Sequence, residues 1–157
     1  IAGYGRRGST IEGPVSWFHP VLMKNIKVYK RERKSKIQYF VLNALGIGRV
    51  FDFRRKNKGK IRYYDGTNIK FPAGDNWKIN SPRSVEYKSW RIGDSMCLKE
   101  QIRIHSVNVE KVSFDECGNL VELISTFSIN SKLDHRYWFK PNKGMVKSKK
   151  LSKDKKK

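Results

Sequence analysis

Apolar and polar residues alternate in short runs along this chain, and no run repeats apolar residues at helical spacing. The clearest alternation extends from Val85 to Ile92, and a shorter one covers residues 102–105. Alternation of this kind places apolar side chains on one face of a β-strand. Other short segments are rich in Val, Ile, Tyr and Phe, which favour strands. The pattern predicts strands at residues 26–29, 37–45, 49–54, 61–64, 68–71, 85–92, 96–109, 120–129 and 137–139.

Segments rich in Gly, Asn, Asp and Pro separate these predicted strands. Residues 55–60 are predicted to form a basic hairpin loop, and Asp65-Gly66 is a strong signal for a tight turn. Further turns are predicted at Gly93-Asp94 and at residues 115–119. Short strands separated by turns in this way predict an all-β fold, as a single small antiparallel barrel or sandwich.

The two ends of the chain differ from its middle. Residues 1–20 contain four Gly and two Pro, and they predict a basic, irregular N-terminal arm that Trp17 could anchor on the core. Residues 148–157 are rich in Lys and Ser, and we expect this tail to be disordered unless a polyanion holds it. The predicted β-rich domain covers residues 21–147.

The composition fits one folded domain. The chain has 157 residues, of which 38% are hydrophobic and 12% aromatic, so it can build a core and is not expected to be disordered throughout. No apolar run approaches the roughly 20 residues that a membrane-spanning helix needs, so no transmembrane segment is predicted.

The charge of the chain is strongly positive and unevenly distributed. Lys and Arg number 35 against 14 Asp and Glu, which gives a net charge of +21. Basic residues cluster in residues 24–36, 54–62 and 140–157, whereas the acidic residues concentrate between Glu86 and Asp134. A general compositional bias towards Lys explains such clustering less well than a polyanionic partner does. Nucleic acid, RNA in the first place, is the favoured partner, and anionic lipid and acidic polysaccharide are the alternatives.

Candidate binding residues come from these clusters, because Lys and Arg contact phosphates and a neighbouring aromatic ring can stack on a base. Aromatic residues lie next to bases at Tyr63-Tyr64 and at residues 137–139, although alternate members of each run are expected in the core. The predicted nucleic-acid-binding residues are Arg6, Arg7, Lys30, Arg31, Arg33, Lys34, Arg54, Arg55, Lys56, Lys58, Lys60, Arg62, Tyr64, Arg136, Lys147, Lys149 and Lys150.

The case for catalysis is weaker than the case for binding. His105 with Glu110, or His135 with Arg136, could supply the acid–base pair of a metal-independent ribonuclease. Isolated histidines on strands are more often structural, so a non-catalytic role is favoured and the question of an enzyme stays open. Residues 3–8 match G-x-G-x-x-G, but no predicted strand precedes them and no helix follows, which argues against a dinucleotide site.

Cysteine usage gives no metal site. Cys97 and Cys117 lack the close pairing of zinc ligands, so they predict either one disulfide or two buried thiols. No metal and no other cofactor is predicted. The chain begins at Ile1, which fits the removal of a signal or transit peptide as well as an arbitrary boundary. An intracellular or organellar ribonucleoprotein is favoured, and an envelope or secreted location is the alternative.

The C-terminal part of the chain resembles a known family. From about Glu110, residues 112–119, the aromatic run 137–139 and Gly144-Met145-Val146-Lys147 are similar to a bacterial family of lipocalin-like cell-envelope β-proteins, which carries a PAGTF turn and a final GVGLVK motif. The Pro-Ala-Gly-Thr-Phe core is absent at that position of this chain. The resemblance implies a barrel-like antiparallel fold, a processed N-terminus and no established catalytic role.

Three hypotheses about function follow. The leading one is a non-catalytic, basic RNA-binding protein that belongs to a ribonucleoprotein or another multi-protein assembly, such as a ribosome. The second is a secreted or envelope β-domain that binds an anionic surface or a protein partner. The third is the small ribonuclease described above.

Overall fold

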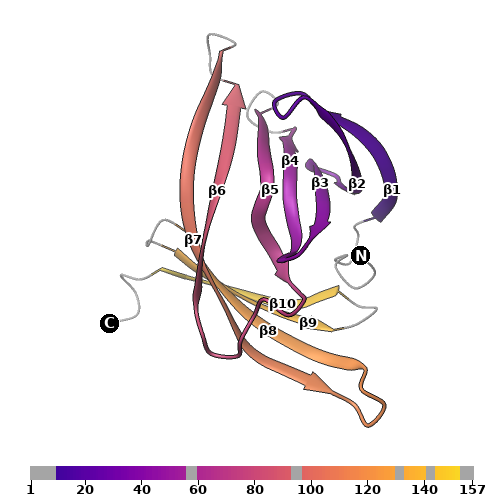
Figure 1. The fold of residues 1–157 in the computed structure, drawn as a ribbon, viewed down its shortest axis with the longest axis vertical. Helices are drawn as coiled ribbons and strands as arrows, with labels where there is room; N and C mark the ends of the chain where they lie inside the picture. Colours follow the sequence, from indigo (N-terminus) through magenta and orange to yellow (C-terminus); the bar gives the residue numbers. More distant parts are fainter. Residues whose placement is uncertain (1–9, 56–59, 93–96, 130–132, 141–143, 153–157) are drawn as a thin grey trace.

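One antiparallel sheet of ten strands makes up the part of the chain that the structure describes. The computed structural model describes residues 10–55, 60–92, 97–129, 133–140 and 144–152, and within these ranges it contains strands and no helix (Figure 1). The strands are β1 (Thr10–His19), β2 (Lys24–Arg33), β3 (Lys36–Asn43), β4 (Gly46–Arg54), β5 (Lys60–Pro72), β6 (Arg83–Ile92), β7 (Leu98–Phe114), β8 (Leu120–Ile129), β9 (Leu133–Lys140) and β10 (Gly144–Ser152). The described part of the chain holds no helix with the length and apolarity of a membrane span.

Each strand pairs with the next one along the chain, so the strand order in the sheet is β1 to β10. The prediction of an all-β, antiparallel fold is therefore confirmed. The barrel alternative is wrong, because β1 and β10 do not pair with each other and the sheet stays open. Within β1, Pro14 has no N–H to donate, and the pairing with β2 shifts register between Glu12 and Val15.

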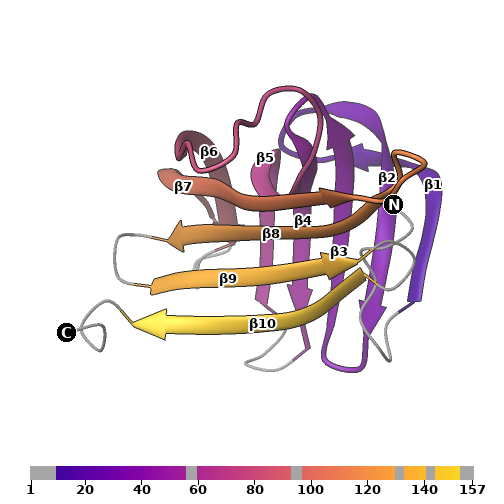
Figure 2. The same ribbon diagram turned by 90° about the horizontal axis from the view of Figure 1, so that it is seen from below.

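The sheet folds over on itself at β7. The first part of this strand pairs with β6 and the last part with β8, so that β7 passes from one layer to the other. Figure 2 shows β8, β9 and β10 side by side across the strands of the N-terminal layer. The open sheet therefore has two crossing layers that share β7.

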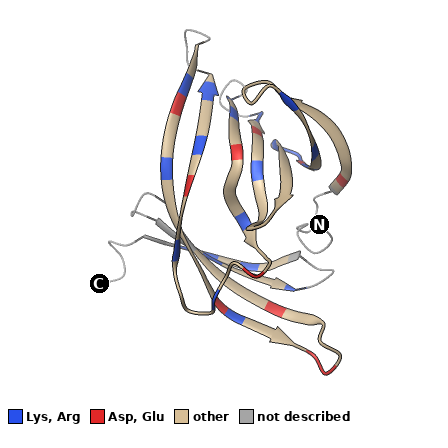
Figure 3. Ribbon diagram, in the orientation of Figure 1, with Lys and Arg blue, Asp and Glu red and all other residues tan. Residues whose placement is uncertain are grey.

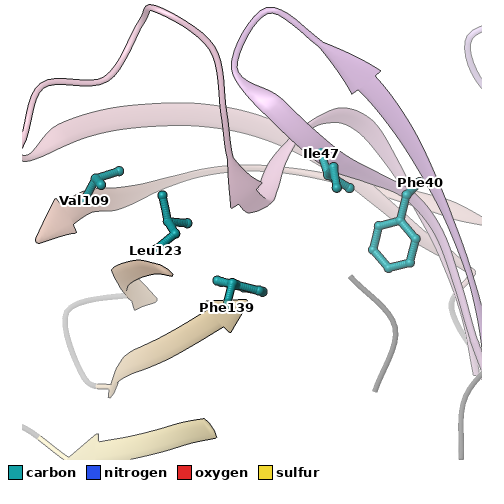
Figure 4. Close-up of a cluster of buried hydrophobic side chains, with 5 residues drawn as sticks. All are labelled: Phe40, Ile47, Val109, Leu123 and Phe139. Atoms are coloured by element: carbon teal, nitrogen blue, oxygen red, sulfur yellow. The ribbon is translucent and has the colours of Figure 1, made fainter. Parts of the chain in front are cut away.

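A hydrophobic cluster joins the two layers (Figure 4). Its buried residues are Phe40 of β3, Ile47 of β4, Val109 of β7, Leu123 of β8 and Phe139 of β9. Side chains alternate along a strand, so Phe40 and its neighbour Tyr39 lie on opposite sides of the N-terminal layer. We call these sides the Phe40 face and the Tyr39 face. The C-terminal layer packs on part of the Phe40 face.

The β1–β2 hairpin covers the Tyr39 face. The ring of Trp17 on β1 lies 5.2 Å from the ring of Tyr39 and 6.4 Å from that of Tyr63, measured between centroids. At the end of β1, the Nδ1 atom of His19 accepts hydrogen bonds from two backbone N–H groups, so its Nε2 carries the proton and donates to the carbonyl of Tyr64 at 2.8 Å. This hairpin thus holds a second, aromatic core.

Both predicted ends contain more structure than expected. The irregular arm was predicted to extend through residue 20, but residues 10–19 form β1. The tail was predicted to begin at residue 148, but β10 continues through Ser152. Both strands obtain their order from backbone hydrogen bonds to a neighbouring strand, which composition alone does not reveal. Residues 1–9 and 153–157 lie outside the described ranges.

Asp65-Gly66 forms a bulge inside one strand, and the prediction of a tight turn between two strands is wrong. The carboxylate of Asp65 accepts hydrogen bonds from the backbone N–H groups of Thr67 at 3.0 Å and of Lys88 at 2.9 Å. Gly66 has a φ of 97°, which glycine adopts without strain. These local bonds let β5 continue through the irregularity, and the pairing with β4 shifts register here.

Candidate functional site

Strand register places basic side chains next to one another across the Phe40 face. At the end of β2, Arg33 lies opposite Lys36 of β3, and Lys36 lies opposite Arg54 of β4. Arg54 in turn lies opposite Lys60 of β5. Residues directly opposite each other on neighbouring strands point to the same side of the sheet. We call these four residues the first cation row.

A second row runs parallel to the first, two residues further along each shared strand. It crosses six strands from β2 to β7, and each member lies opposite the next: Arg31, Gln38, Asp52, Arg62, Arg91 and Lys99. Neighbouring strands lie about 4.8 Å apart, so this second cation row spans about 24 Å. Asp52 is the one acidic residue of the two rows. Figure 3 shows the basic positions spread over β4 to β7, among few acidic ones.

Like charges stand directly opposite one another in these rows, which costs stability. There are three such pairs in the first row and two in the second, where Arg91 lies between Arg62 and Lys99. Arg54, Lys60, Arg91 and Lys99 are exposed, whereas the other cations of the rows are half-buried or buried. The surface therefore offers a line of accessible positive charge that a negative ligand would stabilise.

Replacing the middle member of a like-charged trio should stabilise the free protein. In Arg91→Thr, two repulsive contacts disappear and a strand-favouring residue enters, so we expect the free energy of unfolding to rise by about 0.5–1 kcal/mol at low salt. The gain should shrink as salt screens the repulsion. Urea denaturation at two salt concentrations measures it.

Lys88→Thr is the matched control for this substitution. Lys88 lies on the same strand but on the Tyr39 face, opposite the uncharged Ile102. This variant carries the change in strand propensity without the repulsion. Equal effects of the two substitutions would show that the cation rows carry no repulsive energy.

The buried end of this surface has a perturbed electrostatic environment. The pKa of the Lys36 ammonium is lowered to about 8, mainly by burial; the charge of Asp52 opposes this shift, and the positive charges of Arg33, Arg54 and Arg31 add to it. Burial also holds the pKa of Lys70 well below its ordinary value, with the charge of Arg49 next in importance. Both lysines therefore lie in a desolvated, positive region.

Several predicted binding residues are among the rows and others are not. Arg31, Arg33, Arg54, Lys60 and Arg62 come together on the Phe40 face. Lys30 lies on the Tyr39 face, where its ammonium is 3.5 Å from Glu32, and Arg55 pairs with the same carboxylate at 3.1 Å. Arg55 also donates to the carbonyl of Lys34 at 2.9 Å, which fits a structural role at this turn. The side chain of Lys34 is exposed beside that turn.

Tyr64 is placed differently from the stacking role that the sequence suggested. Its side chain is on the Phe40 face and only 2% exposed, and the guanidinium of Arg49 lies 4.1 Å from its ring centroid. A ring buried in this way has no free face for a nucleotide base, so we leave Tyr64 out of the candidate surface.

The predicted residues of the C-terminal layer form a separate group. Phe139 of β9 points into the core, so its neighbour Trp138 points to the outer side of this layer. The Trp138 ring is flanked by the guanidinium of Arg136 at 5.2 Å and the ammonium of Lys147 at 4.6 Å. Lys149 lies opposite Arg136, whereas Lys150 lies opposite His135 and points to the other side. This group has its own basic surface, apart from the cation rows.

The list of predicted binding residues lacks three of the basic members of the rows: Lys36, Arg91 and Lys99. Each lies on a predicted strand or beside one, and the alternation of residues 85–92 already assigns Arg91 to one face. What the sequence did not supply was the pairing register, which decides which cations become neighbours. Four other predicted residues, Arg6, Arg7, Lys56 and Lys58, lie outside the described ranges.

The His105–Glu110 pair suggested for a ribonuclease does not come together. His105 and Glu110 are five residues apart on β7, a separation of about 17 Å along a strand. Glu110 instead accepts a hydrogen bond from Arg136 at 2.6 Å. Burial and the charge of Lys70 lower the pKa of His105 to about 4, and its ring packs 5.1 Å from that of Tyr87. His135 stacks on Tyr137, with 6.0 Å between the ring centroids.

The cysteines and possible metal ligands give no further site. Cys97 and Cys117 are both exposed and are not joined by a disulfide, so neither alternative predicted for them is correct. In the ranges that the structure describes, no three His, Cys, Asp or Glu side chains gather closely enough to hold a metal ion.

Comparisons of the chain with protein-family models, with curated proteins and with solved structures found no match. The resemblance to lipocalin-like envelope proteins therefore stays a prediction, and the function has to be argued from the residues of this chain.

Proposed function

We propose that the protein binds a nucleic acid, RNA in the first place, through the phosphate backbone and without catalysing a reaction. The observation that supports this proposal is the placement of like charges side by side in the two cation rows. Such an arrangement is unfavourable in the free protein and becomes favourable when phosphates lie between the cations. The rows extend over a distance that accommodates several phosphates in succession.

The chemistry of the rows favours a contact that does not depend on nucleotide sequence. Lys and Arg side chains bind phosphate oxygens, and these contacts fix position while carrying no direct sequence information. A base-stacking residue is missing from the rows, since Tyr64 is buried and the neighbouring Tyr63 belongs to the aromatic core. Binding is therefore expected to be strongly salt-dependent and similar for different sequences. The separate basic surface around Trp138 would add a second contact.

The test is a salt titration of binding. Fluorescence anisotropy of a labelled single-stranded RNA, a DNA of the same sequence and heparin is measured at several salt concentrations, for the wild type and for a variant that lacks the exposed members of the rows. That variant carries Arg54→Gln, Lys60→Gln, Arg91→Gln and Lys99→Gln. The logarithm of the association constant falls as the logarithm of the salt concentration rises, and each phosphate contact contributes about 0.7 to the steepness of this fall. The four substitutions should therefore reduce the steepness by about 3 and the affinity at low salt by about 100-fold or more.

A control of equal charge separates the rows from net charge. Four lysines outside the rows are replaced by Gln together, and they are Lys24, Lys78, Lys88 and Lys111. This control should keep most of the affinity and slope of the wild type. An equal loss in both variants would mean that net charge and not the rows drives binding. Heparin bound as tightly as RNA, or no binding of RNA and DNA at low salt, would overturn the assignment to nucleic acid.

A further inference from the structure

Asp52 lies at the centre of the second cation row with more positive charge around it than it can balance. The residue is 5% exposed, and its Oδ2 atom is 3.2 Å from Arg49 and 3.6 Å from Arg54. Its charge also acts on Lys36 and Lys70. Two guanidinium groups and two lysines thus surround one carboxylate, which is itself largely desolvated. Desolvated cations without enough counter-charge are costly, so the site is suited to an additional anion.

Two hydrogen-bond acceptors at this place still lack a donor. Asp52 Oδ1 and the side-chain carbonyl Oε1 of Gln38 are buried, and neither has a hydrogen-bond partner among the described residues. Gln38 and Asp52 lie directly opposite each other on β3 and β4, so their side chains are neighbours on the Phe40 face. The Nε–H of Arg49 is likewise a buried donor that has no acceptor among the described residues. A ligand that satisfies this site has to donate and accept hydrogen bonds.

This combination selects among anions. Sulfate is fully deprotonated at neutral pH and only accepts hydrogen bonds, so it would face the acceptors of Asp52 and Gln38 with its own lone pairs. Hydrogen phosphate carries an O–H group, and a terminal phosphate ester is about half protonated near pH 6. Such a group can donate to Asp52 or Gln38 while its other oxygens accept from the surrounding cations.

We propose that Asp52, Gln38 and the cations around them bind a compact, protonated phosphate group. The group is either free hydrogen phosphate or the terminal phosphate of a nucleic acid. The assignment to a terminal phosphate rests on the proposed function, because the site belongs to the same rows. Arg54, whose side chain is 60% exposed, links the buried cluster to solvent. Burial is the main cause of the lowered pKa values of Lys36 and Lys70, and the positive charges around both lysines add to it.

The first experiment compares phosphate with sulfate. Calorimetric titrations of the wild-type protein in a buffer free of both anions, at equal ionic strength and pH 7, give the two affinities. One hydrogen bond gained by phosphate and one repulsive contact suffered by sulfate should make phosphate bind at least about tenfold more tightly. Equal affinities for the two anions, or no binding of phosphate, would overturn the proposal.

A substitution at Asp52 tests the origin of this preference. In Asp52→Asn the side chain keeps its shape and gains an amide donor, so the preference for phosphate over sulfate should fall to about twofold or less. Asp75→Asn, in an exposed loop, is the control and should keep the wild-type preference. Gln38→Met removes the second acceptor at similar size and should reduce the preference in the same direction, which keeps the test valid if Asp52→Asn does not fold. An unchanged preference in the folded variants would contradict the assignment.

Binding of RNA with and without a 5′-phosphate shows whether the site takes the end of a nucleic acid or free phosphate. At pH 6, a 5′-phosphorylated RNA should bind at least about tenfold more tightly than the same RNA with a 5′-hydroxyl, and free phosphate should compete for the difference. A gain from the end phosphate that survives Asp52→Asn unchanged would overturn this use of the site. If both RNAs bind equally and phosphate still binds in preference to sulfate, the site takes free phosphate. If phosphate binds but neither RNA does, the proposed function fails and the phosphate site stands.

Discussion

Between pH 7 and pH 4 the protein is expected to lose about 3 kcal/mol of stability through His105 alone. The side chain is 3% exposed, and burial together with the charges of Lys70 and Arg49 lowers its pKa from 6.5 to about 4. In this range the unfolded chain binds a proton at His105 and the folded protein does not. Stability is therefore greatest above pH 6.5 and decreases as the pH falls towards 4.

Urea denaturation at several pH values tests this expectation. His105→Gln removes the titrating group, so its free energy of unfolding should depend much less on pH between 6.5 and 4 than that of the wild type. His19 adds a smaller loss in the same direction, because burial also lowers its pKa. If His105→Gln keeps the full pH dependence, another group is responsible for it.

The central strands could be predicted because their sequences carry both the alternation and the turn residues. The run from Val85 to Ile92 lies inside β6, and its buried positions follow the predicted alternation over most of its length. The outer strands carry weaker signals. β1 contains Gly13 and Pro14, and β10 has Lys or Ser at most of its positions, so both are stabilised mainly by pairing with a neighbour.

The Asp65-Gly66 pair shows why a local motif leaves two structures open. A hairpin turn and a bulge can both use an aspartate that accepts hydrogen bonds from nearby N–H groups and a glycine with a positive φ. Which one forms depends on whether the flanking residues stay paired with the same neighbours. Here both halves of β5 pair with β4, so the strand continues.

The candidate surface was predictable in its residue types but not in its arrangement. Lys30 and Arg31 are adjacent in one basic cluster, yet alternation sends them to opposite faces. Arg31 joins the second cation row, whereas Lys30 pairs with Glu32. Counting charges therefore located the basic segments but not the arrangement of their side chains. Only the register shows which cations repel each other, and hence where an anion is favoured.

The largest loss of stability is expected from Gly48→Ala in β4, at the place where the bulge of β5 comes closest. A Cβ atom at this position would overlap the backbone carbonyl oxygen of Gly66, and backbone atoms cannot move aside as a flexible side chain does. The two strands would have to separate, so we expect a loss of about 4 kcal/mol or more. Pairing of β4 with β5 also brings Arg54 next to Lys60, so RNA binding should weaken with it.

Gly118→Ala separates this overlap from the general effect of adding a side chain at a glycine. Gly118 has a positive φ of 81°, and no atom lies within 4 Å of the place that a Cβ would occupy, so this substitution meets backbone strain without a clash. Its cost should be about 1 kcal/mol. Urea denaturation of both variants gives the comparison. A Gly48→Ala protein as stable as Gly118→Ala would contradict the close approach of β4 and β5 at this position.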